Sequence, residues 1–97
     1  MANFEWDEAK AEENLRKHGI GFRDASSSLL GLSCTVASPR GGENRFTSLC
    51  ETNGRLIAVV WTPRFGAIRL ISARAARKHE QEHYRQSIRR TAPTWGQ

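Results

Sequence analysis

Three arginines in the second half of the chain could contact a phosphate group: Arg64, Arg69 and Arg74. Arg64 falls in a predicted turn, Arg69 alternates with apolar residues in a predicted strand, and Arg74 is expected at the start of the following helix. Three guanidinium groups around one phosphate would stabilise the charge that grows in a phosphoryl-transfer transition state. A solvated face of the sheet is the alternative, and the residues alone support both interpretations.

A second group of candidate residues lies near the N-terminus. Lys10, Asn14 and His18 are spaced four residues apart, with Lys17 beside them, so a helix would place all four on one polar stripe. Such a stripe could bind a phosphate backbone or move protons, and Trp6 could stack on a base. The simpler alternatives favour His18 as a helix-end cap and Trp6 as a core anchor.

Four more residues are weaker candidates. Glu51 could act as a general base, although a cross-strand salt bridge to an arginine is favoured. Tyr84 could contact substrate, although packing of a helix against the sheet is favoured. Arg45 and Arg55 would add positive charge near the other arginines.

Residues 79–83 read His-Glu-Gln-Glu-His and match a zinc-protease pattern, in which two histidines bind zinc and the glutamate activates water. Such a site needs a third protein ligand, and residues 84–97 contain no Asp, Glu, His or Cys. Basic neighbours also disfavour a cation. We therefore expect a solvated, salt-bridged face here and no metal or other cofactor.

The candidate residues must be positioned by helices and strands. The order of these expected elements in the sequence predicts an α+β domain with N-terminal helices. Residues Phe4–Trp6 favour a short edge strand. Residues Asp7–His18 favour a helix, with Asp7 as its N-cap and Gly19 at its C-terminal end. A second helix is predicted over Phe22–Leu30, followed by a strand over Leu32–Ala37.

The strongest local signal is the Asn53-Gly54 pair, which favours a tight hairpin between Arg45–Thr52 and Arg55–Thr62. Residues Leu56–Trp61 are apolar on both faces, which places them at the centre of the sheet. A turn over Pro63–Gly66 and a strand over Ala67–Ile71 complete an antiparallel meander of three to four strands.

The C-terminal part predicts a helix over about residues 73–90, capped by Ser72. The tail, residues 91–97, is expected to be frayed. No linker or repeat divides the 97 residues, so we expect one domain over residues 1–97 with its core at about 4–88.

Composition narrows the class of protein. Fifteen Lys and Arg against ten Asp and Glu give a net charge of +5, so a polyanion is the first partner to consider. No secretory signal or membrane span is visible, which favours a cytoplasmic protein and no membrane partner. Two distant cysteines, Cys34 and Cys50, favour free thiols over a disulfide.

Two stretches of the sequence resemble the BrnT toxins. The first is Phe4-x-Trp6-Asp7-x-x-Lys10-x-x-x-Asn14-x-x-Lys17-His18-Gly19-Ile20-x-Phe22-x-x-Ala25. The second is Ile68-Arg69-Leu70-Ile71-Ser72-Ala73-Arg74-x-Ala76-x-x-x-Glu80-x-x-x-Tyr84, with Glu43-x-Arg45 and Gly54-Arg55 between the two. Together they cover about residues 4–84.

The resemblance implies a RelE-like fold and a metal-independent ribonuclease toxin of a bacterial type II toxin-antitoxin system, which inhibits translation and growth. It also implies neutralisation by a BrnA-like ribbon-helix-helix antitoxin, as a 2:2 heterotetramer that binds operator DNA. Exposed leucines are the expected antitoxin contacts, and the candidates are Leu29, Leu30 and Leu32. The alternative is an inactive homologue that acts as an antitoxin-binding corepressor module.

Overall fold

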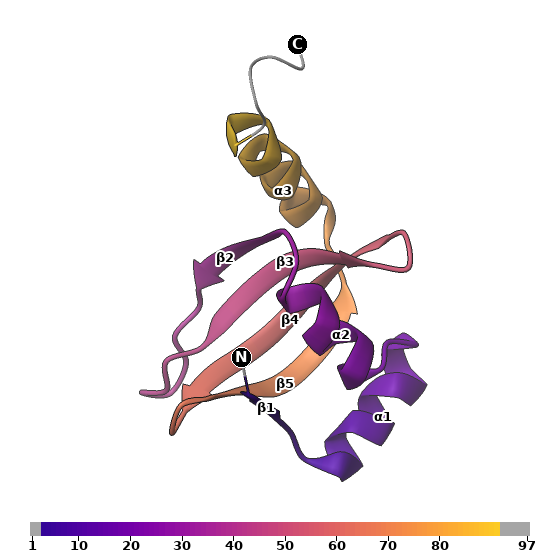
Figure 1. Cartoon of the computed structure of the whole chain (residues 1–97), viewed down its shortest axis with the longest axis vertical. Coiled ribbons are helices and arrows are strands. Elements are labelled where there is room, and N and C mark those ends of the chain that lie inside the picture. The colour runs from indigo at the N-terminus through magenta and orange to yellow at the C-terminus, as the bar shows by residue number, and fades with distance from the viewer. Residues whose placement is uncertain (1–2, 92–97) are drawn as a thin grey trace.

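The computed structural model describes residues 3–91, with the side chains of residues 3–88. A short strand and two helices precede four strands and a final helix (Figure 1). The elements are β1 (Asn3–Glu5), α1 (Glu8–His18), α2 (Phe22–Leu29), β2 (Ser33–Ala37), β3 (Phe46–Thr52), β4 (Arg55–Arg64), β5 (Ala67–Ala75) and α3 (Lys78–Thr91). The α+β class is confirmed. The tail that was expected to be frayed lies, from residue 92 onward, outside the described residues.

The five strands form one mixed sheet in the order β1-β5-β4-β3-β2. Strands β2 to β5 are the predicted antiparallel meander, and the apolar run Leu56–Trp61 lies in its central strand, β4. The prediction of a purely antiparallel sheet is wrong, because β1 pairs in parallel with β5. The chain reaches β2 only after the two helices α1 and α2, which leaves β1 at the opposite edge.

Two tight turns close the hairpins. Asn53 and Gly54 have φ values of 50° and 76°, as the predicted turn between β3 and β4 requires. The turn between β4 and β5 is shorter than expected, because only Phe65 and Gly66 lie outside the strands, with φ values of 49° and 79°. Arg64 is therefore the last residue of a strand and not part of the turn.

Helices cover the two faces of the sheet unequally. On one face α1 and α2 enclose the larger core (Figure 1), in which Phe22 and Ala25 meet Ile57, Val59 and other buried residues. On the other face α3 covers only one end of the sheet and extends beyond it (Figure 1). Its buried Tyr84 packs there with Leu49 and Ala58, so much of this second face is left open.

The last strand is longer, and the last helix starts later, than the sequence suggests. Ser72 and Arg74 pair with β4 residues and belong to β5, which corrects the prediction of a cap at Ser72 and a helix from residue 73. The long apolar strand β4 extends the ladder to Ala75. The helix then begins at Lys78, and the Glu80 carboxylate accepts a hydrogen bond from the Arg77 N–H at 2.8 Å.

Both cysteines are free, as expected. They lie on neighbouring strands, but Cys34 is opposite Leu49, and Cys50 is the next residue along β3. Successive side chains of a strand point to opposite faces. The two thiols therefore lie on different sides of the sheet and cannot bridge without a change of register.

Asn14 fastens α1 to β5. Its side chain is 6% exposed, and its Nδ2 donates to the Ile20 carbonyl at 3.1 Å and to the Ala73 carbonyl at 2.9 Å. Its Oδ1 accepts from the Ala73 N–H at 3.1 Å. These bonds satisfy backbone groups that would otherwise be buried without partners. Asn14 thus has a structural role, and its contact with RNA stays a prediction.

We predict that Asn14→Ala lowers the free energy of unfolding by about 3 kcal/mol, because two buried carbonyls and one N–H lose their partners. Asn14→Asp should cost at least as much, since its second oxygen would face the two carbonyls. Urea unfolding monitored by circular dichroism measures both changes. The exposed Glu12→Ala on the same helix is the control, with an expected change within about 0.5 kcal/mol. An Asn14→Ala variant as stable as this control would contradict the assignment.

Candidate functional site on the open face of the sheet

The face of the sheet opposite α1 and α2 carries the arginines singled out in the sequence. Arg69 is opposite Thr62, Arg74 is opposite Ala58, and Arg64 is two residues beyond Thr62. Because alternate residues of β4 share one face, all three arginines lie on the same side as the buried Ala58. We call Arg64, Arg69 and Arg74 the arginine row.

A β-bulge brings Arg69 and Arg74 to the same face. Five positions separate them, so an uninterrupted strand would point them in opposite directions. Trp61 is opposite Leu70 and Val60 is opposite Ser72, which leaves Ile71 without a partner on β4. This extra residue restores the phase. The sequence alone contains no signal that would locate such a bulge.

The arginine row extends along the sheet and does not surround one point. The β4 partners of Arg69 and Arg74 are four residues apart, about 13 Å along the strand. Carboxylates hold two of the three guanidinium groups. Arg69 lies 3.5 Å from Glu5 on β1, and Arg74 forms a bidentate pair with Glu80 on α3. The spacing suits separate phosphates along a strand better than a single phosphate.

The pair between Arg74 and Glu80 is the best-defined interaction on this face. Arg74 Nη1 and Nη2 lie 2.8 and 3.0 Å from the two carboxylate oxygens, and the Arg77 N–H also donates to Glu80. Their side chains are only 22% and 14% exposed. The hydrogen bonds from Arg74 lower the pKa of Glu80 to about 2, and Glu80 in turn raises the pKa of Arg74.

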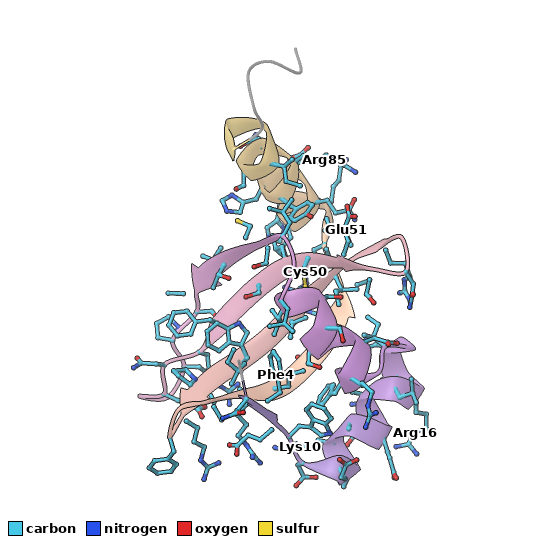
Figure 2. All side chains as sticks on the ribbon, viewed as in Figure 1. Phe4, Lys10, Arg16, Cys50, Glu51 and Arg85 are labelled. Carbon is cyan, nitrogen blue, oxygen red and sulfur yellow. The ribbon has the colours of Figure 1, made fainter. Side chains whose placement is uncertain are left out.

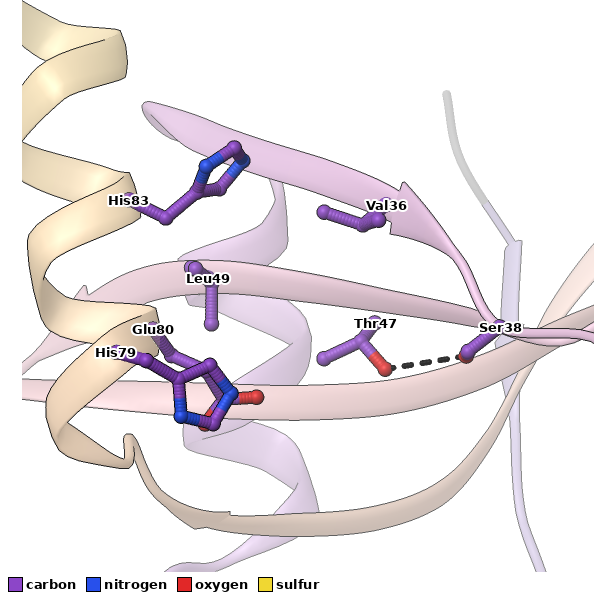
Figure 3. Close-up of a pocket in the computed structure, with 7 residues that line it drawn as sticks. All are labelled: Val36, Ser38, Thr47, Leu49, His79, Glu80 and His83. Carbon is purple, nitrogen blue, oxygen red and sulfur yellow. Dashed lines mark hydrogen bonds between the residues drawn. The ribbon is translucent and has the colours of Figure 1, made fainter.

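A pocket of about 430 Å³ lies between α3 and strands β2 and β3. His79 and His83 are one helical turn apart, and Figure 3 shows both imidazoles extending from α3 over the sheet, with the Glu80 side chain beside His79. The opposite wall comprises Val36, Ser38, Thr47 and Leu49. The pocket therefore combines two groups able to transfer protons with a nearby guanidinium.

In the sequence, His79 and His83 match a zinc-ligand pattern, and a solvated, salt-bridged face is the favoured interpretation. Within residues 3–88, no three His, Cys, Asp or Glu side chains come together as a metal centre would require. Glu80, the presumed catalytic carboxylate of the zinc pattern, is instead bound by Arg74. Their spacing on one helix face was the signal for an acid-base pair, but only the fold shows that this face borders a pocket.

The polar stripe on α1 lies beside β5, the strand that carries Arg69 and Arg74. Lys10, Lys17 and His18 line a small hollow with Ile71 and Ser72 of β5. Lys17 pairs with Glu13 on its own helix at 3.1 Å, which lowers the pKa of Glu13. The hollow adjoins the arginine row at Ser72, which shares the face of Arg74.

Two aromatic candidates pack into the protein. The Trp6 ring packs edge-on against Phe22, with centroids 5.9 Å apart, and its indole N–H donates to Glu8 at 3.0 Å. Tyr84 is 5% exposed, and burial raises its pKa. Both contacts agree with the simpler alternative, in which each ring packs against the protein and does not stack on an RNA base.

The remaining candidates lie away from the His79 and His83 pocket. Glu51 is exposed and forms no ion pair with any side chain of the described part, contrary to the expected salt bridge. Figure 2 labels it at the α3 end of the sheet, and it lines a second hollow that also contains Arg55. Arg45 is paired with Glu43 at 2.8 Å. Glu51 therefore lines a different hollow from His79 and His83, although its β4 partner Leu56 lies on the face of the arginine row.

The fold and this face define a small basic α+β domain with arginines and histidines along an open sheet surface. Residues 6–80 match the family described as "Ribonuclease toxin, BrnT, of type II toxin-antitoxin system". The chain belongs to this family of ribonuclease toxins, which implies an RNA substrate and an antitoxin partner. No curated protein sequence matches it significantly. None of the helices among the described residues is long and apolar enough to cross a membrane.

We predict that Glu80→Gln lowers the free energy of unfolding by about 2 kcal/mol at pH 7, because the carboxylate charge that holds Arg74 is lost. The folded pKa of Glu80 lies below its ordinary 4.5, at about 2. The stabilisation is therefore complete above about pH 4.5 and is lost as the pH falls through 2. Urea unfolding of both proteins at several pH values measures this difference.

Glu82→Gln is the matched control, since Glu82 is exposed on the same helix. Its effect should stay within about 0.5 kcal/mol at every pH. A difference between the wild type and Glu80→Gln that is as large at pH 2.5 as at pH 7 would show that the ion pair is not its source.

Proposed function

We propose that this chain cleaves RNA without a metal ion, at the pocket formed by α3 and the open sheet face. The observation that carries the proposal is the placement of His79 and His83 over one pocket, with Arg74 fixed beside them through Glu80. This arrangement supplies a base, an acid and a cation, which a metal-free cleavage of RNA requires.

In this reaction the RNA 2′-oxygen attacks the adjacent phosphorus while the bond from phosphorus to the 5′-oxygen breaks. One imidazole accepts the proton of the 2′-hydroxyl, and the other donates a proton to the departing 5′-oxygen. The products are a 2′,3′-cyclic phosphate and a free 5′-hydroxyl. Arg74 Nη1 also donates to the Ala75 carbonyl at 3.3 Å, so the Nε–H and the second Nη2–H remain to donate to the phosphate oxygens.

The rest of the arginine row would bind the RNA backbone on one side of the pocket. Arg69 and Arg64 follow Arg74 along the sheet, and Lys10 and His18 border it at β5. These side chains neutralise phosphates and fix the position of the strand. Glu51 is a poor candidate for the general base, because it lies in a different hollow from the histidines.

We further propose that a ribbon-helix-helix antitoxin of the BrnA type neutralises the chain in the cytoplasm. The assembly would be a 2:2 heterotetramer that binds operator DNA through the antitoxin, and free toxin would inhibit translation and growth. Leu30 and Leu32, which are 67% and 59% exposed, support the expected antitoxin contact. Leu29 is half-buried against the core and is a weaker candidate.

An inactive toxin that serves as a corepressor is the second candidate. The observation in its favour is that Arg69 and Arg74 are both already paired with carboxylates. Such a protein would bind its antitoxin but leave RNA intact. Growth after expression without antitoxin distinguishes the two, because only an active toxin arrests it.

We predict that His79→Ala and His83→Ala each reduce RNA cleavage by about 10²- to 10⁴-fold, the range for loss of one proton-transfer group. Cleavage of a labelled RNA in the presence of EDTA measures the rate.

Gln86→Ala, exposed on the same helix, is the control and should cleave at the wild-type rate. Wild-type cleavage that EDTA abolishes and an added divalent cation restores would refute metal independence. Full activity in the variant that lacks both histidines would refute the assignment of the pocket.

We predict that Leu30→Ser together with Leu32→Ser weakens antitoxin binding at least about tenfold, because two exposed apolar contacts are lost. Titration calorimetry with the purified antitoxin measures the affinity. RNA cleavage by the free variant should be unchanged, since neither residue lines the pocket. Unaltered antitoxin affinity would place the interface elsewhere.

A further inference from the structure

The two tight turns of the sheet have similar φ values but different residues. At the turn between β3 and β4, Asn53 has a φ of 50°, and at the turn between β4 and β5, Phe65 has a φ of 49°; a glycine follows each. Asparagine adopts this left-handed conformation readily, whereas a bulky aromatic residue does so at a cost in free energy. Local conformation therefore does not explain the phenylalanine.

Core packing does not explain Phe65 either. The residue is 99% exposed, the highest value among the large exposed hydrophobic residues of the described chain. A side chain that is both strained in its backbone and fully hydrated contributes nothing favourable to folding. Its presence is better explained by a ligand that covers the ring.

The surroundings of Phe65 carry an available positive charge. Arg64 precedes it and forms no ion pair with any described side chain, whereas the nearby Glu43 is already bound to Arg45 at 2.8 Å. Arg64 and Phe65 border a hollow that also includes Asn44, Thr62 and Pro63. A flat apolar ring next to a free guanidinium matches a ligand with a flat ring and an anionic group.

The position of the turn favours a nucleotide as that ligand. Arg64 is the end of the arginine row, and the β4 partner of Arg74 lies six residues before it, about 20 Å along the strand. An RNA strand bound at the pocket and continuing along the row would reach the turn within several nucleotides. Stacking on an aromatic ring is how proteins bind single-stranded bases without reading their sequence.

We propose that Phe65 and Arg64 form a nucleotide-binding subsite, in which the ring stacks on a base and the guanidinium binds a phosphate of the same strand. This subsite rests on the proposed ribonuclease function and adds to it a contact remote from the pocket. It assigns the open end of the β4–β5 hairpin to substrate binding rather than to folding.

The test exchanges the residues of the two turns. Phe65→Asn gives the second turn the sequence of the first, and Asn53→Phe places an aromatic ring at the first turn. The probe is a fluorescent single-stranded RNA of about 12 nucleotides with 2′-O-methyl sugars, which binds without being cleaved, and anisotropy measures its affinity. Thermal unfolding and antitoxin affinity are measured on the same variants.

We expect Phe65→Asn to raise the midpoint of thermal unfolding and to weaken RNA binding at least about fivefold, within the range for loss of one stacked base. Phe65→Trp should bind within about twofold of the wild type. Asn53→Phe should lower the midpoint and leave RNA affinity unchanged. A Phe65→Asn variant that is more stable but binds RNA more weakly would show that Phe65 serves RNA binding and not folding.

Equal RNA affinity for Phe65→Asn and the wild type would overturn the subsite, as would a wild type that does not bind the probe. Loss of antitoxin affinity with unchanged RNA affinity would also overturn it and would assign Phe65 to a protein contact. The proposed ribonuclease function is tested separately by wild-type cleavage of unmodified RNA. If cleavage is absent but Phe65→Asn weakens binding of the probe, the subsite stands and the ribonuclease function fails.

Discussion

The ion pair between Arg74 and Glu80 joins the last strand to the last helix, and the geometry of the open face depends on it. Helix α3 rests on the end of the sheet through Tyr84 and the partly buried Ile88, and it extends past the sheet (Figure 1). Glu80 accepts hydrogen bonds from both the strand and the start of the helix. Because His79 is adjacent and His83 is one turn further, this carboxylate fixes where both imidazoles lie.

Local sequence signals predicted much of the fold, and pairing between distant segments accounts for the rest. The Asn53-Gly54 turn, the apolar β4 and both N-terminal helices depend on neighbouring residues, whose preferences are visible in the sequence. The parallel pairing of β1 with β5 depends on the path that the chain takes through α1 and α2 before it enters the sheet again at β2. The extension of β5 to Ala75 depends on its long partner, so the helix signal at Ser72 was overridden by the ladder.

The candidate site was harder to predict, because the relevant residues act through contacts that spacing does not reveal. The three arginines were identified, but the bulge at Ile71 sets their common face, and no residue type marks a bulge. Asn14 has the right spacing for a polar stripe but lies buried against Ala73. His79 and His83 matched a zinc pattern, and only the tertiary contact between Arg74 and Glu80 gives that segment another interpretation.

The two arginine pairs differ in a way that bears on how RNA would bind. Arg69 and Glu5 meet through one contact at 3.5 Å with both side chains at least 30% exposed, so a phosphate can displace the carboxylate at little cost. Arg74 is held by two short hydrogen bonds in a less exposed position, and separating it from Glu80 would leave a poorly hydrated charge. Arg74 therefore serves best without leaving Glu80, donating its remaining N–H groups in a fixed direction. In the proposed complex, affinity for the RNA backbone would come from Arg69 and Arg64, and orientation at the pocket from Arg74.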